Sequence, residues 1–372
     1  RFDYDPVSLA PRGLLIEDVR TNGVRNGNAT GATVGTPGTL PTNWSQSNNT
    51  GIVPAVVGFG TESGIPYVDL QFVGTPSGTN NNVYPEANGI ISAANGQAWT
   101  LSAYLRVVGG SLTNISSVQF AINEFDSSLA STGGAQAAVP SPTSSGLRTQ
   151  RVSYTRTTTG ATTAYVRPLI QVQPVSGQAI DLTLRIAAVQ LEMGAFASSY
   201  IPTAAASATR AKDVATASIG TLYAASAPGT LEVEFDINQR TPSGYSFGLA
   251  SLSNGSAGSE MAALRITSGG STVVSGQITA GGTSQASPVS ANSWNVGVLN
   301  KAALAWQSGG ASECLNGGAV ASSGALAALP GNVTTLNIGS FNDASNYAFG
   351  GISRIRYWPR ALSQSELVQV TT

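Results

Sequence analysis

The sequence predicts an all-β protein with two antiparallel β-sandwiches in tandem and one short helix at the C-terminus. Short runs of β-branched and aromatic residues recur along the chain, separated by turn-forming residues, as is typical of sandwich folds. Glycine accounts for 43 of the 372 residues, and both Gly and Asn tolerate the positive φ angles that tight turns require. A chain of this length exceeds what one hydrophobic core usually holds, so two domains are expected.

Strand patterns fill residues 31–203 and 219–372, which we predict to be the two sandwiches. Apolar and polar residues alternate in several runs, so that Gln171 and Gln173 point away from the side that Val172 faces. The clearest runs are YVDLQFV (67–73), AWTLSAYLRVV (98–108), VQFAINEF (118–125), TAYVRPLIQVQ (163–173) and IDLTLRIAAVQLE (180–192), with GTLEVEFDIN (229–238) opening the second stretch.

Two segments outside these stretches have a different composition. Residues 1–30 hold much of the chain's charge and only one short strand pattern, GLLIEDV, so we expect an arm that leads into the first sandwich. Residues 204–218 are rich in Ala and Thr and have no apolar stripe with a 3.6-residue period. We therefore expect a linker between the sandwiches there.

One helix is predicted, at the C-terminal end. Ser363 and Glu366 have the S-x-x-E spacing of a capping box, in which each side chain accepts a hydrogen bond from the other residue's backbone N–H. Leu362 and Leu367 flank this box at the spacing of a hydrophobic staple.

Composition excludes several classes of function. Charged residues make up 10% of the chain, against roughly 25% in typical globular proteins, and the net charge is −1, so no partner nucleic acid or anionic membrane surface is expected. No run of about 18 apolar residues indicates membrane insertion. The chain has no histidine, which excludes Ser-His-Asp and Cys-His catalysis and His-ligated zinc. Cys314 is the single cysteine, so no intrachain disulfide forms.

One strand carries a row of carboxylates. Glu232, Glu234 and Asp236 alternate with apolar residues, which places them on one face of a strand about 7 Å apart. Paired carboxylates are the groups that hydrolyse glycosidic bonds, so a glycosidase is one interpretation. A cation-binding ridge is another, and a solvated acidic face is the simplest. We take the solvated face as the leading prediction, with no enzyme activity.

A neutral surface rich in hydroxyl and amide groups suits glycans as partners. Aromatic rings pack on the apolar C–H faces of sugars, while amide and guanidinium groups match sugar hydroxyls as donors and acceptors. For Trp44 a plug at the end of a sandwich is an equal alternative, and for the polar strand residues a solvated sheet face is the alternative. The candidate glycan-binding residues are Trp44, Tyr84, Arg106, Gln119, Asn123, Gln171, Gln173, Arg356 and Trp358.

The loop Asn342-Asp343-Ala344-Ser345-Asn346 offers oxygen ligands for calcium. Asn342, Asp343 and Asn346 form only a weak candidate site, because one carboxylate gives little charge to hold a divalent cation. No other cofactor is expected.

Several strings resemble parts of known virion proteins. RFDYDPVSLAPRGLLIEDVRTN (1–22) and QLEMGAFASSYIPTAAASATRAKDVA (190–215) resemble the segments that precede and close a carbohydrate-binding-module-like jelly roll in phage tail-fibre and head-fibre proteins, and AWTLSAYLRV is similar to a strand pattern of that module. Residues 219–372 resemble a concanavalin A-like, laminin-G-type domain through KAALAWQ, TTLNIGSF and GGISRIRYWPRALSQSEL. The acidic strand has the order E-x-E-x-D, which departs from the E-x-D-x-x-E pattern of concanavalin-like glycosidases.

The resemblance implies an adhesin or decoration protein at the virion surface that binds host cell-surface polysaccharide without chemistry. A purely structural fibre or head-decoration protein is the first alternative, and a glycosidase that uses the acidic strand is the second. The resemblance further implies assembly in the bacterial cytoplasm and contacts with other virion proteins through a segment that precedes Arg1. A homo-oligomer with closed cyclic symmetry is expected, and the resemblance implies a trimer.

Overall fold

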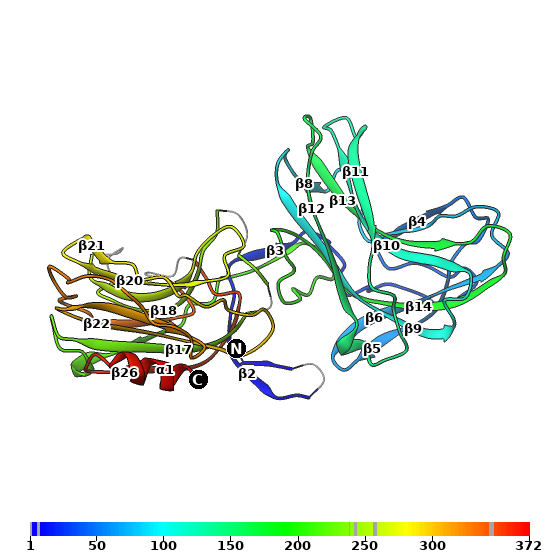
Figure 1. Ribbon diagram of the computed structural model, residues 1–372. Helices are drawn as coiled ribbons and strands as arrows, with labels where there is room; N and C mark the ends of the chain where they lie inside the picture. Colours follow the sequence, from blue (N-terminus) through cyan, green and yellow to red (C-terminus); the bar gives the residue numbers. More distant parts are fainter. Residues whose placement is uncertain (1, 6–7, 238, 242–243, 256–258, 342–345) are drawn as a thin grey trace. The chain divides into compact units, whose positions relative to one another are not determined.

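The computed structural model describes residues 2–5, 8–237, 239–241, 244–255, 259–341 and 346–372 (Figure 1). The chain divides into two compact units, which we call the first sandwich (Arg20–Arg210) and the second sandwich (Arg1–Val19 with Ala211–Thr372). Each is built from antiparallel strands, and the described residues include one short α-helix near the C-terminus, which confirms the predicted fold class. No helix in the described part of the chain is long and apolar enough to cross a membrane.

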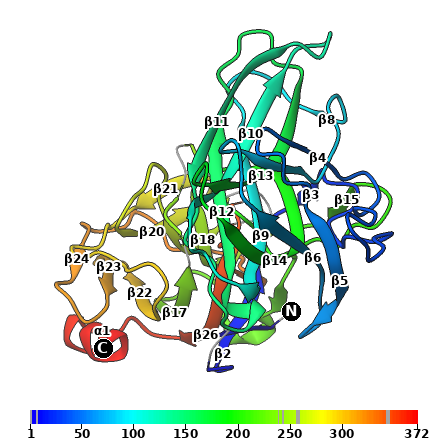
Figure 2. The same cartoon turned by 90° about the vertical axis from the view of Figure 1, so that its right-hand side faces the viewer.

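The first sandwich contains two main sheets. One has the strand order β12-β9-β14-β6-β5, and the other has the order β11-β10-β13-β7-β4, with β8 also paired to β13. In Figure 2 the long strands β10, β11 and β13 run side by side. The strands are β4 (Ser45–Asn48), β5 (Ala55–Glu62), β6 (Ile65–Gly74), β7 (Asn81–Tyr84), β8 (Ile91–Ser92), β9 (Ala98–Gly110), β10 (Ile115–Phe125), β11 (Ser131–Ala138), β12 (Arg151–Thr157), β13 (Tyr165–Pro174) and β14 (Ile180–Met193).

The core of this unit lies between the two sheets. Alternate residues of facing strands supply it, among them Phe120 of β10, Ile170 and Val172 of β13, and Leu184 of β14. Because side chains alternate along a strand, the intervening residues of β10 and β13 point to the outer face of their sheet. A small additional sheet joins β3 (Arg20–Asn22) to β15 (Ala208–Arg210).

The second sandwich also contains two sheets, in the orders β1-β2-β26-β17-β22-β23-β24 and β16-β25-β18-β19-β20-β21. The elements are β1 (Phe2–Tyr4), β2 (Pro11–Ile16), β16 (Thr216–Ser218), β17 (Gly229–Ile237), β18 (Phe247–Ser253), β19 (Met261–Ile266), β20 (Val274–Ala280), β21 (Thr283–Ala286), β22 (Asn300–Gln307), β23 (Gly310–Leu315), β24 (Ala321–Ser322), β25 (Thr335–Ile338), β26 (Gly350–Trp358) and α1 (Gln364–Thr371).

Helix α1 begins as predicted. The Ser363 hydroxyl accepts a hydrogen bond from the Glu366 backbone N–H, and the Glu366 carboxylate accepts one from the Ser363 backbone N–H at 2.7 Å. Leu362 and Leu367 are buried together against Ala303, Ala305 and Cys314 of the neighbouring sheet. The capping box and the staple therefore fix where the helix starts and which side of it faces the sheet.

The ends of the units differ from the expected arm and linker. Strand β2 pairs with β26, so residues up to Val19 belong to the second sandwich, while β3 and the residues after it belong to the first. Within the expected linker 204–218, β15 pairs with β3 and β16 pairs with β25. Composition alone carries no information about such pairing, because backbone hydrogen bonds to a distant strand do not depend on side-chain type.

The role of β2 in the second sandwich can be tested at Ile16. This side chain is 1% exposed and lies against Gly339, so Ile16→Ala is expected to lower the free energy of unfolding of the second sandwich by about 2–5 kcal/mol. Leu9→Ala is the matched control, since Leu9 is 59% exposed. Calorimetry of the full chain should show a shift in one transition only. An unchanged melting profile for Ile16→Ala would mean that β2 does not pair with β26 in solution.

Candidate functional site

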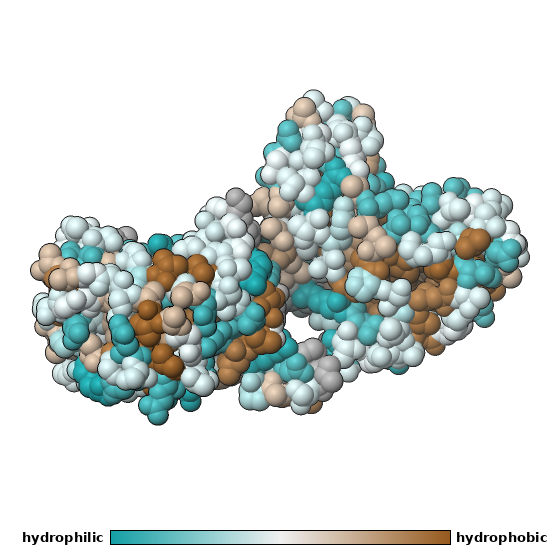
Figure 3. Space-filling model, viewed as in Figure 1, coloured by the Kyte–Doolittle hydropathy of each residue, from teal (hydrophilic) through white to brown (hydrophobic). Residues whose placement is uncertain are grey.

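The outer face of the sheet β11-β10-β13-β7-β4 gathers most of the predicted glycan-binding residues. Gln119 and Asn123 lie on β10, Gln171 and Gln173 lie on β13, and Tyr84 lies on β7. The strand register places Gln119 opposite Gln171 and Asn123 opposite Arg167. Figure 3 shows mainly hydrophilic and neutral residues over the part of the molecule where β8, β11 and β13 lie.

Side-chain amides on this face form a continuous hydrogen-bonded chain. Gln119 Nε2 donates to Gln173 Oε1 at 2.8 Å, and Gln173 Nε2 donates to Gln171 Oε1 at 2.9 Å. Gln171 Nε2 then donates to Asn82 Oδ1 at 2.6 Å, and Asn82 Nδ2 donates to the hydroxyl of Ser47 at 3.3 Å. Each amide is held by its neighbours, so the face presents polar groups in fixed orientations. We call this surface, with Asn123 and Gln136 included, the amide face.

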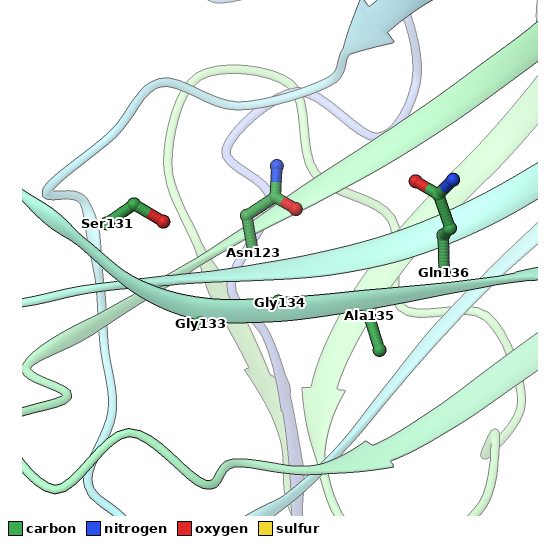
Figure 4. Close-up of a pocket in the computed structure, with 6 residues that line it drawn as sticks. All are labelled: Asn123, Ser131, Gly133, Gly134, Ala135 and Gln136. Carbon is green, nitrogen blue, oxygen red and sulfur yellow. The ribbon is translucent and has the colours of Figure 1, made fainter.

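A pocket of about 380 Å³ opens at the β10–β11 edge of the amide face. In Figure 4, Asn123 and Gln136 point to the same side of the two strands, whereas Ala135 points to the opposite side. Gly134 has a φ of +154°, and a Cβ placed there would lie 3.1 Å from Asn123 Oδ1, so a glycine leaves this amide uncovered. The pocket is lined by Asn123, Ser131, Gly133, Gly134, Ala135 and Gln136.

Asn123 and Gln136 differ from the rest of the amide face in one respect. Within the described residues, neither side-chain amide has a hydrogen-bond partner. Each amide provides two N–H donors and an acceptor oxygen, and these groups point into a pocket that a ligand can enter. Gln136 was not predicted from the sequence, because β11 consists mainly of Gly, Ala, Ser and Thr and has no strong strand pattern.

Arg167 is a second residue that sequence reasoning missed. Its guanidinium carbon lies 3.8 Å from the centre of the Tyr84 ring and 5.1 Å from that of Phe125. The ring of Tyr84, predicted as a platform for sugar, is thus covered by Arg167 on one side. The signal was present in the sequence, since Arg167 is four residues before Gln171 and so shares its face of the strand.

Two predicted residues of the first sandwich lie elsewhere. Trp44 is buried, and its indole N–H donates to the carbonyl oxygen of Asn26 at 2.9 Å, so it is a plug in the sandwich rather than a sugar platform. Arg106 lies on β9 in the other sheet and binds both carboxylate oxygens of Glu62 at 2.8 Å.

The predicted solvated acidic face of β17 is wrong. Glu232 is 1% exposed, and Glu234 and Asp236 are each 7% exposed. Glu232 pairs with Arg356, and Glu234 pairs with Arg354. Cations on the neighbouring strands satisfy these charges, because β26 places an arginine directly opposite each glutamate.

The remaining members of this ion-pair row complete the picture in the second sandwich. Lys301 Nζ lies 3.8 Å from Glu234, and Arg12 Nε lies 3.7 Å from Asp236. Burial raises the pKa of Asp236, and Arg12 opposes this effect. Trp358 is half-buried and packs against the residues under α1, with Arg356 5.3 Å from its ring centre. Arg356 and Trp358 are therefore structural partners of the acidic strand.

The predicted calcium loop lies mostly outside the described residues. Asn342 and Asp343 are not among them, and the backbone carbonyl of Asn346 accepts a hydrogen bond from Gly248 N at 2.6 Å. Within the described residues, no three carboxylate or thiol side chains come together as a metal site.

Glu313 is a buried carboxyl that the sequence did not single out. It lies on β23 opposite Leu304, which directs its side chain into the core of the second sandwich. Both carboxyl oxygens are buried, and in the part of the chain that the structure describes neither has a hydrogen-bond partner. Burial raises the pKa of Glu313 to about 9, so the group is a neutral acid at pH 7.

A known protein family resembles the second sandwich. Residues 209–368 match the family model described as the concanavalin A-like lectin/glucanases superfamily. This match supports the concanavalin A-like prediction for that part of the chain. No curated protein matches the chain.

Solved structures give weaker similarities. The CBM40 of a Ruminococcus gnavus IT-sialidase bound to α2,3-sialyllactose is 21% identical over 41% of this chain and 86% of that chain, with a TM-score of 0.34. A heptameric SAP-like pentraxin from Limulus polyphemus is 12% identical over 40% of this chain and 71% of that chain, with a TM-score of 0.32. Domains LG4-5 of the mouse laminin α1 chain are 10% identical over 82% and 95%, with a TM-score of 0.28. Similarity at this level says nothing about ligand or activity.

The structural role of the acidic strand can be tested at Glu232. Glu232→Gln leaves Arg356 without its partner and is expected to destabilise the second sandwich by about 1–2 kcal/mol. This loss is smaller than the loss on breaking a fully buried ion pair, because the Arg356 side chain is 38% exposed. The double variant Glu232→Gln/Arg356→Met should recover part of the loss in a double-mutant cycle. Hydrolysis of a polysaccharide that Glu232→Gln abolishes without a change in stability would contradict this assignment.

Glu313 gives a pH prediction. The pKa of Glu313 is higher in the folded state than in the unfolded state. Ionisation of this group therefore leaves the free energy of unfolding unchanged below about pH 4.5 and lowers it as the pH rises toward 9. Glu313→Gln cannot ionise and should remove this slope, leaving the second sandwich more stable than wild type by up to roughly 5 kcal/mol at pH 8 but not at pH 4. Calorimetry across this range tests the prediction. A slope that persists in Glu313→Gln would assign it to another group.

Proposed function

We propose that the chain binds a glycan on the amide face of the first sandwich, without chemistry. The observation that carries this proposal is the pocket at the end of an ordered amide chain, where the amides of Asn123 and Gln136 have no partner within the described residues. Sugars present hydroxyl groups that both donate and accept hydrogen bonds, and side-chain amides provide the same combination. Carboxylates suited to glycoside hydrolysis are absent from the pocket lining, and those of β17 are engaged by arginines.

The arrangement predicts weak binding at one site. Hydrogen bonds exchanged with water contribute only about 0.5–1.5 kcal/mol each, so a few amide contacts give an affinity of roughly millimolar to high micromolar. The fixed amide chain reduces the ordering cost of binding but adds little contact area. Several linked copies raise the apparent affinity by about 10²–10⁴ without new contacts. A homo-oligomer with closed cyclic symmetry is therefore part of the proposal, and the resemblance to phage fibres favours a trimer.

We further propose that the chain acts at the surface of a phage-like particle, as an adhesin or decoration protein for host polysaccharide. The support is the resemblance of residues 1–22 and 190–215 to segments of tail-fibre and head-fibre proteins. The structure adds that these two segments meet, since β3 pairs with β15. Antibodies against the purified chain should label the surface of intact phage particles from the source of the protein. Phage particles that stay unlabelled would contradict this part of the proposal.

Binding is tested with the full chain on a glycan array, presented as a tetravalent streptavidin complex to raise its avidity. Asn123→Ala/Gln136→Ala should lower the signal on the bound glycans by roughly tenfold or more, because both unpartnered amides are removed. Gln178→Ala, an exposed amide in the turn between β13 and β14, is the matched control and should bind like wild type. Equal binding by all three proteins would place the site elsewhere, and no binding by wild type would contradict the proposal itself.

A further inference from the structure

Arg167 lies on the amide face beside the pocket. The strand register places it directly opposite Asn123, which in turn is opposite Gly134 of the pocket lining. Adjacent strands lie about 4.8 Å apart, so the three residues form a row roughly 10 Å long across β13, β10 and β11. A sugar that occupies the pocket and extends along this row reaches the strand position of Arg167, whose guanidinium packs over the rings of Tyr84 and Phe125.

In the part of the chain that the structure describes, the guanidinium of Arg167 has no neutralising carboxylate. Within the described residues, no carboxylate forms an ion pair with it, and its buried Nε–H has no acceptor. Several other arginines of the same sandwich pair with carboxylates: Arg25 with Glu86, Arg156 with Glu124, and Arg185 with Asp69. Arg151 instead donates to the Ser102 hydroxyl and the Ser198 carbonyl.

This cation is costly to keep. Burial lowers the pKa of Arg167, with the Tyr84 hydroxyl acting in the opposite direction, and an arginine stays charged in either case. A half-buried charge without a counter-charge loses hydration. The packing of the guanidinium on the Tyr84 and Phe125 rings offsets part of that loss. Packing on these two rings does not require a charge, since a Met side chain would also fill the space between them.

We propose that Arg167 makes the amide face selective for a sugar that carries a carboxylate, that is, for an acidic glycan. This inference rests on the proposed function and specifies its ligand class. Arginine binds carboxylates through two parallel N–H donors, while Asn123 and Gln136 are placed for the hydroxyls of the same or the adjoining sugar. A single guanidinium matches the single charge of a carboxylate, whereas heavily sulfated glycans need several cations to neutralise them. The pocket-lining residues themselves include no cationic side chain, so the charge has to come from Arg167 beside the pocket.

The experiment compares matched ligands on the full chain. Glycan arrays that carry uronic-acid, sialic-acid, sulfated and neutral glycans identify the strongest probe. Titration calorimetry then compares the acid with its methyl ester, which has the same sugars without the charge. We expect the methyl ester to bind roughly tenfold or more weakly, and Arg167→Met to bind both forms equally weakly. Arg167→Lys should retain part of the preference, since it keeps the charge but loses the fork.

Two controls separate a ligand-binding role from a structural one. Arg148→Met removes the same charge from an exposed site on the first sandwich, so it should bind like wild type. Arg167→Met should melt within about 2 °C of wild type or above it, because it removes an unneutralised cation from a half-buried position. A fall of many degrees would instead assign Arg167 to folding.

The outcomes distinguish this inference from the proposed function. Glycan binding with equal affinity for the acid and the ester, unchanged in Arg167→Met, would overturn the inference and leave the proposed function standing. A preference for sulfated over carboxylated probes would overturn the carboxylate assignment. Failure of the wild-type chain to bind any glycan would overturn both.

Discussion

The side-chain amide of Asn22 supplies hydrogen bonds that β14 loses at its bulge, and the closure of the first sandwich depends on it. The register of β14 shifts between Ala187 and Gln190, which interrupts pairing with β9. There Asn22 Nδ2 donates to the carbonyl of Val189 at 3.1 Å, and Asn22 Oδ1 accepts from the N–H of Leu191 at 3.2 Å. The same amide also donates to the carbonyl of Ile201 and accepts from Val24 N. One buried side chain thus joins the first strand of the sandwich to the segment that ends it.

Residues that follow Asn22 continue this clasp. Gly23 N donates to the carbonyl of Leu191, and Val189 N donates to the carbonyl of Gly27. A Cβ on Gly27 would lie 2.3 Å from the Val189 oxygen, so only glycine allows this approach. The single cysteine cannot form an intrachain disulfide, so hydrogen bonds rather than a covalent link join the two ends of the sandwich. These bonds satisfy backbone polar groups of β14 that the buried bulge would otherwise leave unpaired. Residues from the two ends of the first sandwich thus meet in this clasp.

The sequence predicted what depends on local pattern and missed what depends on distant pairing. Alternation along β13 placed Gln171 and Gln173 on one face, and the capping box located α1, because both signals lie within a few residues. By contrast, the acidic strand was predicted to be solvated, because the residues near Glu232 in the sequence do not indicate that Arg356 lies opposite it on β26. The same limit applies to β2, whose partner β26 is more than 300 residues away in the chain. The sequence left two interpretations of Trp44 open, a plug and a sugar platform, for a related reason. The burial of Trp44 depends on Asn26 and the loops around it, which lie elsewhere in the chain.

The distribution of charge explains why the two sandwiches offer different surfaces. Charged residues are scarce, at 10% of the chain, and most of those described on the sheets form ion pairs. In the second sandwich the charged groups of the sheet form ion pairs with one another, and helix α1 packs beside them, so few charges remain for a ligand. In the first, the amide face satisfies itself through uncharged groups and leaves Asn123 and Gln136 unengaged at its edge. Arg167 is the one guanidinium on the described residues of that face and has no counter-charge among them, so the acidic ligand that we propose would supply the partner that its surroundings favour.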